Sequence, residues 1–490
     1  MASFLLFLSA SVLFAQSTAA FNCAKAPIYV DIHKRAVHGT DVFQYGSFIG
    51  VGNPSQNQSL WPSLIRNDTI ITDSNYCDHS TLANCAQSTR GNFDTSLSTS
   101  FVQEKNFQSL DHNITDLNGT FTGEFGQDDL HLYTHFFETD GASQNVVSKY
   151  TIEVATNGSA APGIVGMGYS STLLQTLYDQ NLIAGRTYSL YIGSGMDRAG
   201  GVINGSNVFG GYDAGRFQGD VHKYPMRTDN ASPFPVTVQD IIISDGGDST
   251  SNISLFDPAS FSNLKTRPDP FEARLTTEQY PLSLPYEITQ NYIKKLSAGP
   301  SGNSDGSLKL NKPFAGTMTI ILDDGFTITM PNNVMFNTSG ISPVAARDEN
   351  STDPFLLSVA FLSQVYLMAD YDTYQFFLAT AIQEQKAVMP RTFCPKATPT
   401  PYIPPKASGF AQQGMIGAVI GGVVGGIGLI SFASCLFLGL RSSRAAKKAE
   451  RAEEEEKARG KATMLQFDID DKTDFEAPPK TATPFFWNKR

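Results

Sequence analysis

The sequence carries little charge and few cysteines for its length. Charged residues make up 17% of the 490 residues, and the net charge at pH 7 is −11. Soluble domains usually contain about 25% charged residues. Nucleic-acid binding requires a basic face, which a net negative charge disfavours, so the sequence predicts no nucleic-acid partner. Five cysteines exclude a small scaffold held together by many disulfides, and the hydrophobic share of 41% excludes general disorder.

The N-terminus has most features of a secretory signal peptide. An apolar stretch runs from Phe4 to Phe14, and small residues that suit signal-peptidase cleavage follow up to Ala20. The basic residues that usually begin such a peptide are missing. We predict that residues 1–20 are a signal peptide that takes the chain into the secretory pathway, and we exclude them from the fold.

A second apolar segment predicts a membrane anchor. No charged residue occurs from Gly414 to Leu440, which is enough chain to cross a bilayer as one helix. The basic residues that follow it are Arg441, Arg444, Lys447 and Lys448. The positive-inside rule therefore places the charged tail 441–490 in the cytosol. These features predict a single-pass type I membrane protein at the plasma membrane, with the bilayer as a partner and the N-terminal part outside.

The residues in and before this anchor support two further expectations. Residues 395–413 are rich in Pro, Thr and Ser without an apolar period, which predicts an extended stalk. Within the anchor, Gly417, Gly421 and Gly425 recur at every fourth position. This spacing is typical of helix pairs that form a homodimer, although glycine is also common in membrane helices that do not associate.

Sequons for N-glycosylation occur only before the anchor. They begin at Asn57, Asn67, Asn113, Asn118, Asn157, Asn204, Asn230, Asn252, Asn337 and Asn350. Their one-sided distribution agrees with a glycosylated N-terminal part on the lumenal or extracellular side.

Residues 21–389 have the pattern of a β protein. Short apolar or alternating runs recur between turn signals, and residues 317–330 alternate on both sides of Asp324-Gly325, as in a β-hairpin. Helical patterns are few and short, the clearest being 171–180 and 286–296. The sequence therefore predicts a mostly antiparallel, all-β architecture.

Several segments in fixed order resemble the pepsin family of aspartic proteases. Residues 163–168 read G-I-V-G-M-G, residues 209–213 read F-G-G-Y-D, and residues 282–285 read L-S-L-P. Further similar segments are 49–60, 120–132, 187–193 and 355–381, so that the resemblance extends from about residue 44 to 382. It implies a bilobal pepsin-like acid-protease fold with a central cleft, built from lobes 21–228 and 229–394, in addition to the predicted transmembrane helix.

The catalytic tripeptides of that family are missing from the chain. The family uses two aspartates, one in each lobe, that share a proton within Asp-Thr-Gly or Asp-Ser-Gly loops. Neither tripeptide occurs in the sequence. Spacing from the flanking motifs places Ser63 or Leu64 at the first position and Thr276 at the second, and Asp116 at the position of the flap tyrosine. A hydroxyl group cannot replace a carboxylate as general base at neutral or acid pH.

Two functions follow from this departure. The first is a catalytically inactive membrane glycoprotein whose cleft binds a peptide or a cell-surface polymer, such as a wall polymer. The alternative is an active, membrane-anchored aspartic-type endopeptidase that uses non-standard loops. In that case Asp68 or Asp73 would supply one carboxylate, and Glu272 or Glu278 the other.

The cysteines and histidines complete the sequence-based expectations. The resemblance implies a small disulfide between Cys77 and Cys85, while Cys23 and Cys394 bracket the ectodomain and are expected to pair in an oxidising compartment. His131 and His135 lie four residues apart in a strand-like context without a third ligand. We therefore expect no metal site and no cofactor.

Overall fold

The computed structural model describes residues 21–104, 111–114, 119–133, 144–196, 198, 201–228, 232–246, 251–337 and 339–404, together with isolated residues between 436 and 451. At 111–114 and 144 the description covers the backbone alone. The predicted signal peptide 1–20, most of the predicted anchor 414–440 and most of the tail 441–490 lie outside the described residues. None of the helices in the described part of the chain is long and apolar enough to cross a membrane.

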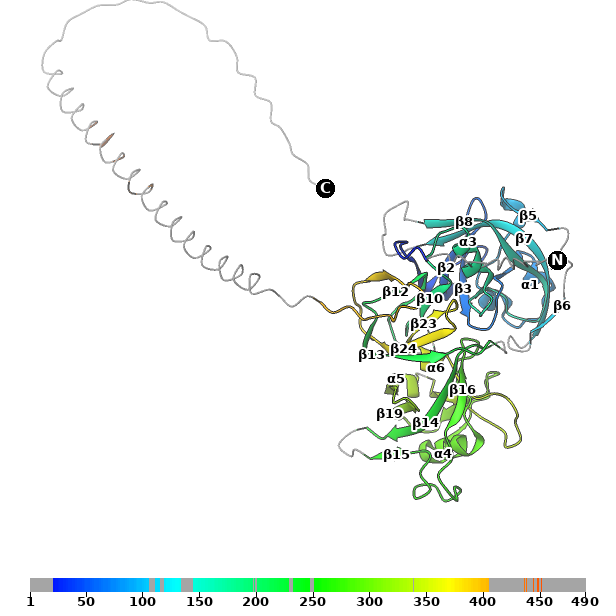
Figure 1. Cartoon of the computed structure of the whole chain (residues 1–490), viewed down its shortest axis with the longest axis vertical. Helices are drawn as coiled ribbons and strands as arrows, with labels where there is room; N and C mark the ends of the chain where they lie inside the picture. The colour runs from blue at the N-terminus through cyan, green and yellow to red at the C-terminus, as the bar shows by residue number, and fades with distance from the viewer. Residues whose placement is uncertain are drawn as a thin grey trace, which may run out of the picture. The chain divides into compact units, whose positions relative to one another are not determined.

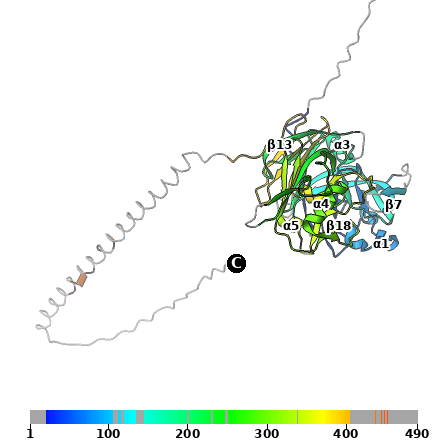
Figure 2. The ribbon, with the colours of Figure 1, turned by 90° about the horizontal axis from the view of Figure 1, so that it is seen from below.

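The chain divides into two units, Met1–Tyr402 and Ile403–Arg490, and every described strand belongs to the first. Strands account for 42% and helices for 12% of the structure, which confirms the predicted mostly-strand fold. Within this unit, β7 and α1 lie at one end and β13 at the other (Figure 2).

The largest sheet has 14 strands and runs in the order β13-β24-β23-β10-β11-β1-β2-β3-β9-β4-β8-β7-β5, with β6 paired to β7. Its strands are β1 (Ile28–Ala36), β2 (Phe43–Val51), β3 (Gln56–Ser63), β4 (Ile70–Thr72), β5 (Val102–Gln103), β6 (Asp111–Ile114), β7 (Gly119–Tyr133), β8 (Gln144–Gly158), β9 (Ile164–Gly166), β10 (Thr187–Tyr191), β11 (Gly205–Phe209), β13 (Phe217–Pro225), β23 (Val365–Asp370) and β24 (Gln375–Ala381). All residues of β10 and β11 are buried, as expected for strands in the middle of a covered sheet.

A second sheet of six strands has the order β20-β19-β14-β16-β22, with β15 paired to β14. Its strands are β14 (Pro235–Ser244), β15 (Asn252–Ser254), β16 (Phe271–Leu275), β19 (Thr317–Leu322), β20 (Thr327–Met330) and β22 (Leu356–Leu357). Two small sheets consist of β17 (Ala298–Pro300), β18 (Ser307–Leu310) and β21 (Ile341–Ala345), and of β12 (Gly211–Asp213) with β25 (Pro390–Thr392). Figure 1 shows β14, β16 and β19 on one side of β23 and β24, and β2, β3 and β8 on the other.

The chain leaves the large sheet after β13 and enters the second sheet with β14, on either side of the predicted lobe boundary at 228/229. It returns to the large sheet with β23 and β24, which pair with β10 and β13. Segments from both predicted lobes therefore meet in one sheet. The division into lobes 21–228 and 229–394 remains a prediction.

The local patterns read from the sequence form the expected elements. Strands β19 and β20 pair antiparallel across Asp324-Gly325, and buried residues alternate with more exposed ones along β19. Helices α3 (Thr172–Asp179) and α4 (Tyr286–Leu296) match the two predicted helices. The Ser171 side chain caps α3 by accepting a hydrogen bond from the Leu174 amide. The short helices are α1 (Tyr76–His79), α2 (Cys85–Ser88), α5 (Asn332–Met335), α6 (Val359–Leu362) and the 3-10 turn η1 (Thr95–Leu97).

Both expected disulfides are present. Cys77 and Cys85 join α1 to the start of α2, with their Cα atoms 5.6 Å apart. Cys23 and Cys394 join the two ends of the first unit, with their Cα atoms 5.3 Å apart and 371 residues between them in sequence. The second bond closes a very long loop, and constraints of this kind stabilise a fold mainly by restricting the unfolded chain.

Candidate ligand-binding cleft

Two loops from distant parts of the sequence meet at the floor of a cleft. The first follows β3, which ends at Ser63 and runs parallel to β9. The second follows β16, which ends at Leu275 and pairs with β14 and β22. Each loop is therefore attached to the end of a strand in a different sheet, which fixes its position.

Direct hydrogen bonds join the two loops. The Ser63 hydroxyl donates to Oε1 of Glu278 at 2.5 Å, although the two residues are 215 positions apart in sequence. The backbone amide of Leu64 donates to Oγ1 of Thr277 at 3.3 Å. The indole Nε1 of Trp61 donates to the carbonyl oxygen of Thr277 at 2.8 Å. These bonds hold the loops against each other without a pair of aspartates.

The predicted catalytic positions carry hydroxyl or apolar groups that are buried. Ser63 and Leu64 are both fully buried, and Leu64 belongs to the hydrophobic core while Ser63 faces the opposite loop. Thr276 is also buried, and its Oγ1 accepts a hydrogen bond from the Glu278 amide at 3.1 Å. The carboxylate at this floor comes from Glu278, two residues beyond the position at which an aspartate is expected.

Two cavities adjoin the meeting point of the loops. The Trp61 cavity has a volume of about 530 Å³ and is lined by Tyr45, Trp61, Arg90 and Arg198 among others. The Asp305 cavity has a volume of about 710 Å³ and is lined by Arg274, Thr276, Asp305 and Asp353 among others. Residues Glu278, Gln279 and Tyr280 line both, so the two cavities are neighbouring parts of one cleft.

Arg90 is the first of two arginines in the Trp61 cavity. Its guanidinium lies 4.8 Å from the ring centre of Trp61, and its Nη1 donates a hydrogen bond to the carbonyl oxygen of Tyr45. Burial lowers the pKa of Arg90 to about 10, while the charge of Glu278 acts in the opposite direction. Arg90 therefore remains a cation at neutral pH in a poorly solvated place.

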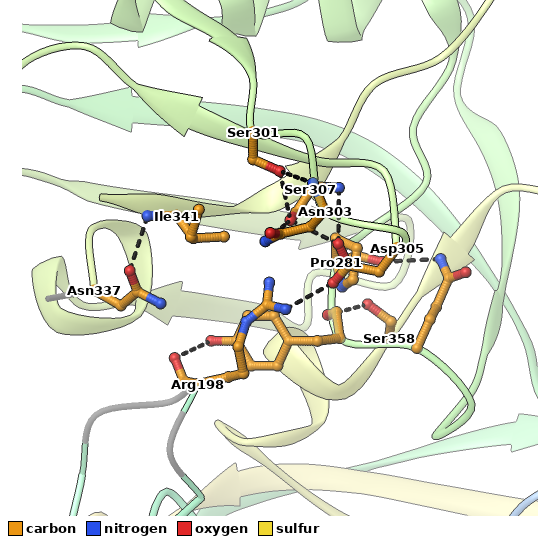
Figure 3. Close-up of polar contacts among 11 residues, drawn as sticks. Arg198, Pro281, Ser301, Asn303, Asp305, Ser307, Asn337, Ile341 and Ser358 are labelled. Atoms are coloured by element: carbon orange, nitrogen blue, oxygen red, sulfur yellow. Dashed lines mark hydrogen bonds and ion pairs between the residues drawn. The ribbon is translucent and has the colours of Figure 1, made fainter. Parts of the chain in front are cut away.

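Arg198 is the second, and it joins the two sides of the cleft. Its Nη1 lies 2.7 Å from Oδ2 of Asp305 (Figure 3). Its guanidinium lies 4.6 Å from the ring centre of Tyr280. The Tyr280 hydroxyl donates to the carbonyl oxygen of Arg198 at 3.1 Å, and burial raises the pKa of Tyr280 to about 12. Burial alone would raise the pKa of Asp305, but hydrogen bonds from Ser307 and Arg198 bring it below its ordinary value. Sequence analysis did not single out Arg90 or Arg198, because isolated arginines carry no motif.

The other acidic candidates lie elsewhere. Asp73 accepts a hydrogen bond from the Asn75 amide at 2.8 Å in the turn before α1. Asp68 lies near Glu153 of β8, whose pKa is raised to about 7 by burial and by the charge of Asp68, against the effect of Arg66. Glu272 receives hydrogen bonds of 2.9 and 2.6 Å from the guanidinium of Arg227. Of the four acids proposed for an active enzyme, Glu278 alone is among the described residues that line the two cavities.

The remaining predicted positions are the two histidines, the flap position and the sequon asparagines, and they differ in how far they are buried or described. His131 places Nε2 3.0 Å from the carbonyl oxygen of Gly52, whereas His135 and the flap position Asp116 lie outside the described residues. Among the sequon asparagines, Asn57 and Asn337 are partly buried, and the side chains of Asn113, Asn118 and Asn230 are not described. The exposed ones are Asn67, Asn157, Asn204, Asn252 and Asn350.

Comparison with known proteins agrees with the order of the motifs. A family model for eukaryotic aspartyl protease matches residues 44–381, so the chain belongs to the eukaryotic aspartyl protease family. Rhizopuspepsin-4 from Rhizopus niveus is 23% identical over 343 residues, which cover 67% of this chain and 75% of that protein. Secreted aspartic protease 3 from Candida albicans is 29% identical over 122 residues, which cover 23% of this chain and 29% of that protein. The crystal structure of aspartic proteinase from Irpex lacteus matches with a TM-score of 0.48 and 17% identity, covering 72% of this chain and 97% of that one.

Proposed function

We propose that this protein is a catalytically inactive member of its family, anchored in a membrane by one helix, whose cleft binds a peptide or a cell-surface polymer. The observation that carries the proposal is the pairing of Ser63 with Glu278 at the floor of the cleft. Peptide hydrolysis by this family needs two carboxylates that share one proton, one to activate water and one to polarise the substrate carbonyl. Here one partner is a hydroxyl group.

The position of Glu278 favours the alternative function, an active endopeptidase. It brings one carboxylate to the floor of the cleft, and a second one would complete a proton-sharing pair. Asp68 and Asp73 are the sequence-based candidates for that second group. Their surroundings argue against this role: the Asn75 amide donates to Asp73, the charge of Asp68 acts on Glu153 of β8, and neither acid lines the two cavities that Glu278 lines.

Incubation of the full chain with peptide libraries between pH 3 and pH 7 separates the two functions. We expect peptide binding without cleavage, and an active fungal aspartic protease serves as the positive control. Cleavage that pepstatin inhibits would overturn the proposal. If cleavage occurs, loss of activity in Glu278→Gln and in the Asp68→Asn, Asp73→Asn double variant would identify the acids.

The membrane anchor and the glycans belong to the same proposal. They are supported by the uncharged stretch from Gly414 to Leu440, by the one-sided sequons and by a relative whose name describes it as secreted. A chain that stops after residue 413 should appear in the medium, whereas the full chain should stay with membranes.

Removal of N-glycans should reduce the apparent mass of both. In the full chain, a Gly421→Leu substitution should reduce cross-linking if the glycine face forms a homodimer.

A further inference from the structure

Two arginines in the cleft are each stacked on an aromatic ring. Arg90 lies over Trp61 and Arg198 over Tyr280, and all four side chains line the Trp61 cavity. Arginine has a planar fork of N–H donors that matches the two oxygens of a carboxylate, and stacking fixes the orientation of that fork. The cavity therefore contains two oriented groups suited to an anionic ligand.

Both guanidinium groups have donors to spare. Arg90 donates one hydrogen bond, to Tyr45, and none of the ion pairs among the described residues includes it. Arg198 uses Nη1 for Asp305, while its buried Nε and Nη2 have no hydrogen-bond partner in the described part of the chain. Buried N–H donors without partners are unfavourable, and a bound anion would accept hydrogen bonds from the donors that Tyr45 and Asp305 do not engage.

The backbone at Arg90 gives independent support for a site. Its φ angle is +63°, in the left-handed region that residues with a Cβ atom rarely adopt. The carbonyl oxygen of Arg90 accepts a hydrogen bond from the Ser59 amide of β3 at 2.9 Å, which holds the strained residue in place. Strained positions of this kind cluster at ligand sites.

We infer that the Trp61 cavity binds the carboxylate of an acidic side chain in an extended peptide, with Arg90 as its main partner and Arg198 as its second. The inference rests on the proposed function and names the ligand that the cleft selects. A peptide is the ligand that the proposed function assigns to this cleft, and an acidic side chain is the part of it that two oriented guanidinium groups would select. The Trp61 cavity sets two arginines against the one carboxylate of Glu278. The Asp305 cavity sets Glu278, Asp305 and Asp353 against the one cation of Arg274, so an acidic side chain is favoured in the first cavity and repelled in the second.

Tryptophan fluorescence can measure this binding in the full chain. The chain has two tryptophans, and a Trp487→Phe substitution leaves Trp61 as the single reporter inside the cavity. The probes are pools of end-blocked decapeptides that are identical except for Glu or Gln at one position. We expect the Glu pool to bind about tenfold more tightly than the Gln pool, as for a charge-assisted pair of hydrogen bonds.

Substitutions of the arginines test the assignment. Arg90→Asn removes the charge and suits the left-handed backbone, and we expect the ratio of Glu to Gln affinities to fall to about one. Arg198→Gln should lower the ratio by a smaller factor and carries the test if Arg90→Asn does not fold. The control is Arg267→Gln, because Arg267 is a half-exposed arginine that lines neither cavity, and the ratio should not change.

Each outcome has a defined meaning. Equal binding of the Glu and Gln pools would refute the inference and leave the proposed function standing. Absence of binding both by every peptide pool and by an oligouronate would refute the inference and the proposed function. A preference for Glu that survives in both arginine variants would also refute the inference. A Gln pool with a free C-terminal carboxylate that matches the Glu pool would support the same carboxylate site, occupied by a chain end. An oligouronate that binds more tightly than all peptides would overturn the choice of a peptide.

Discussion

The loop that follows β3 presents a hydroxyl group and a core leucine at the floor of the cleft, whereas the loop that follows β16 presents two threonines and a carboxylate. The two loops are nevertheless hydrogen-bonded to each other, Ser63 to Glu278 and the Leu64 amide to Thr277. The contact between the loops consists of one hydroxyl–carboxylate bond and one amide–hydroxyl bond, and neither bond involves an aspartate. The two loops of this family member are therefore held together without the two aspartates of the Asp-Thr-Gly or Asp-Ser-Gly loops.

The largest effect on stability should come from substitution of Leu64, the buried leucine of the first loop. Leu64 is fully buried in the core, so Leu64→Ala should lower the free energy of unfolding by about 2–5 kcal/mol. Denaturant unfolding followed by circular dichroism measures the change. Ile65→Ala is the matched control, because Ile65 is only partly buried and its loss should be smaller. Equal losses would show that the first loop is not anchored through Leu64.

A pH dependence of stability is expected from Glu153 on β8, which lies behind the first loop. Glu153, whose amide bonds to the Thr69 carbonyl behind that loop, has a pKa raised from 4.5 to about 7. The folded protein then binds a proton that the unfolded chain releases above pH 4.5. The free energy of unfolding should therefore fall between about pH 4.5 and 7, by up to about 3 kcal/mol, and stay low above pH 7.

Glu153→Gln should remove this decrease, as measured by thermal unfolding across the same pH range. Asp68→Asn should narrow the pH range over which the free energy of unfolding falls, because the negative charge of Asp68 contributes to the raised pKa of Glu153. Glu287→Gln, a substitution of an exposed acid on α4, serves as the control and should leave the profile unchanged. A profile that is identical in Glu153→Gln and in the unsubstituted chain would contradict the prediction.

The second loop can be weakened through one hydroxyl group. Thr277→Val keeps the shape of the side chain but leaves the buried Leu64 amide without its acceptor, which should cost about 1–3 kcal/mol. The matched change is Thr329→Val on the exposed face of β20, where a small effect is expected. Denaturant unfolding gives the decrease in the free energy of unfolding for each variant, and the ratio of the two decreases measures how far the hydrogen bond between the loops stabilises the fold. Similar decreases would mean that this hydrogen bond contributes little.

The smallest effect on stability and binding is expected for Glu272, which lines neither cavity of the cleft. Glu272 pairs with Arg227 at a half-exposed site, where such pairs contribute about 0–1 kcal/mol. Glu272→Gln should therefore change neither stability nor peptide binding measurably, whereas Glu278→Gln should change peptide binding. If Glu272→Gln alters binding, the acid of the cleft has been assigned wrongly.

Local elements could be predicted from the sequence because neighbouring residues encode them. The hairpin around Asp324-Gly325 and the helices α3 and α4 follow from alternation and from helical spacing over short segments. The disulfides followed from the family resemblance and from the positions of the cysteines. The residues at the cleft floor were harder, since Ser63 and Leu64 were equally compatible with the spacing, and Glu278 was one of two acids considered for the second loop.

The sequence by itself determined which groups this protein lacks: no Asp-Thr-Gly or Asp-Ser-Gly occurs, and no folding can create one. Only the tertiary structure decided which groups stand in their place. It brings Glu278 to Ser63 across 215 residues of chain, and it places Arg90 and Arg198 in one cavity. The physical reason is that such contacts arise from the pairing of strands far apart in sequence, which a local pattern of residues does not encode.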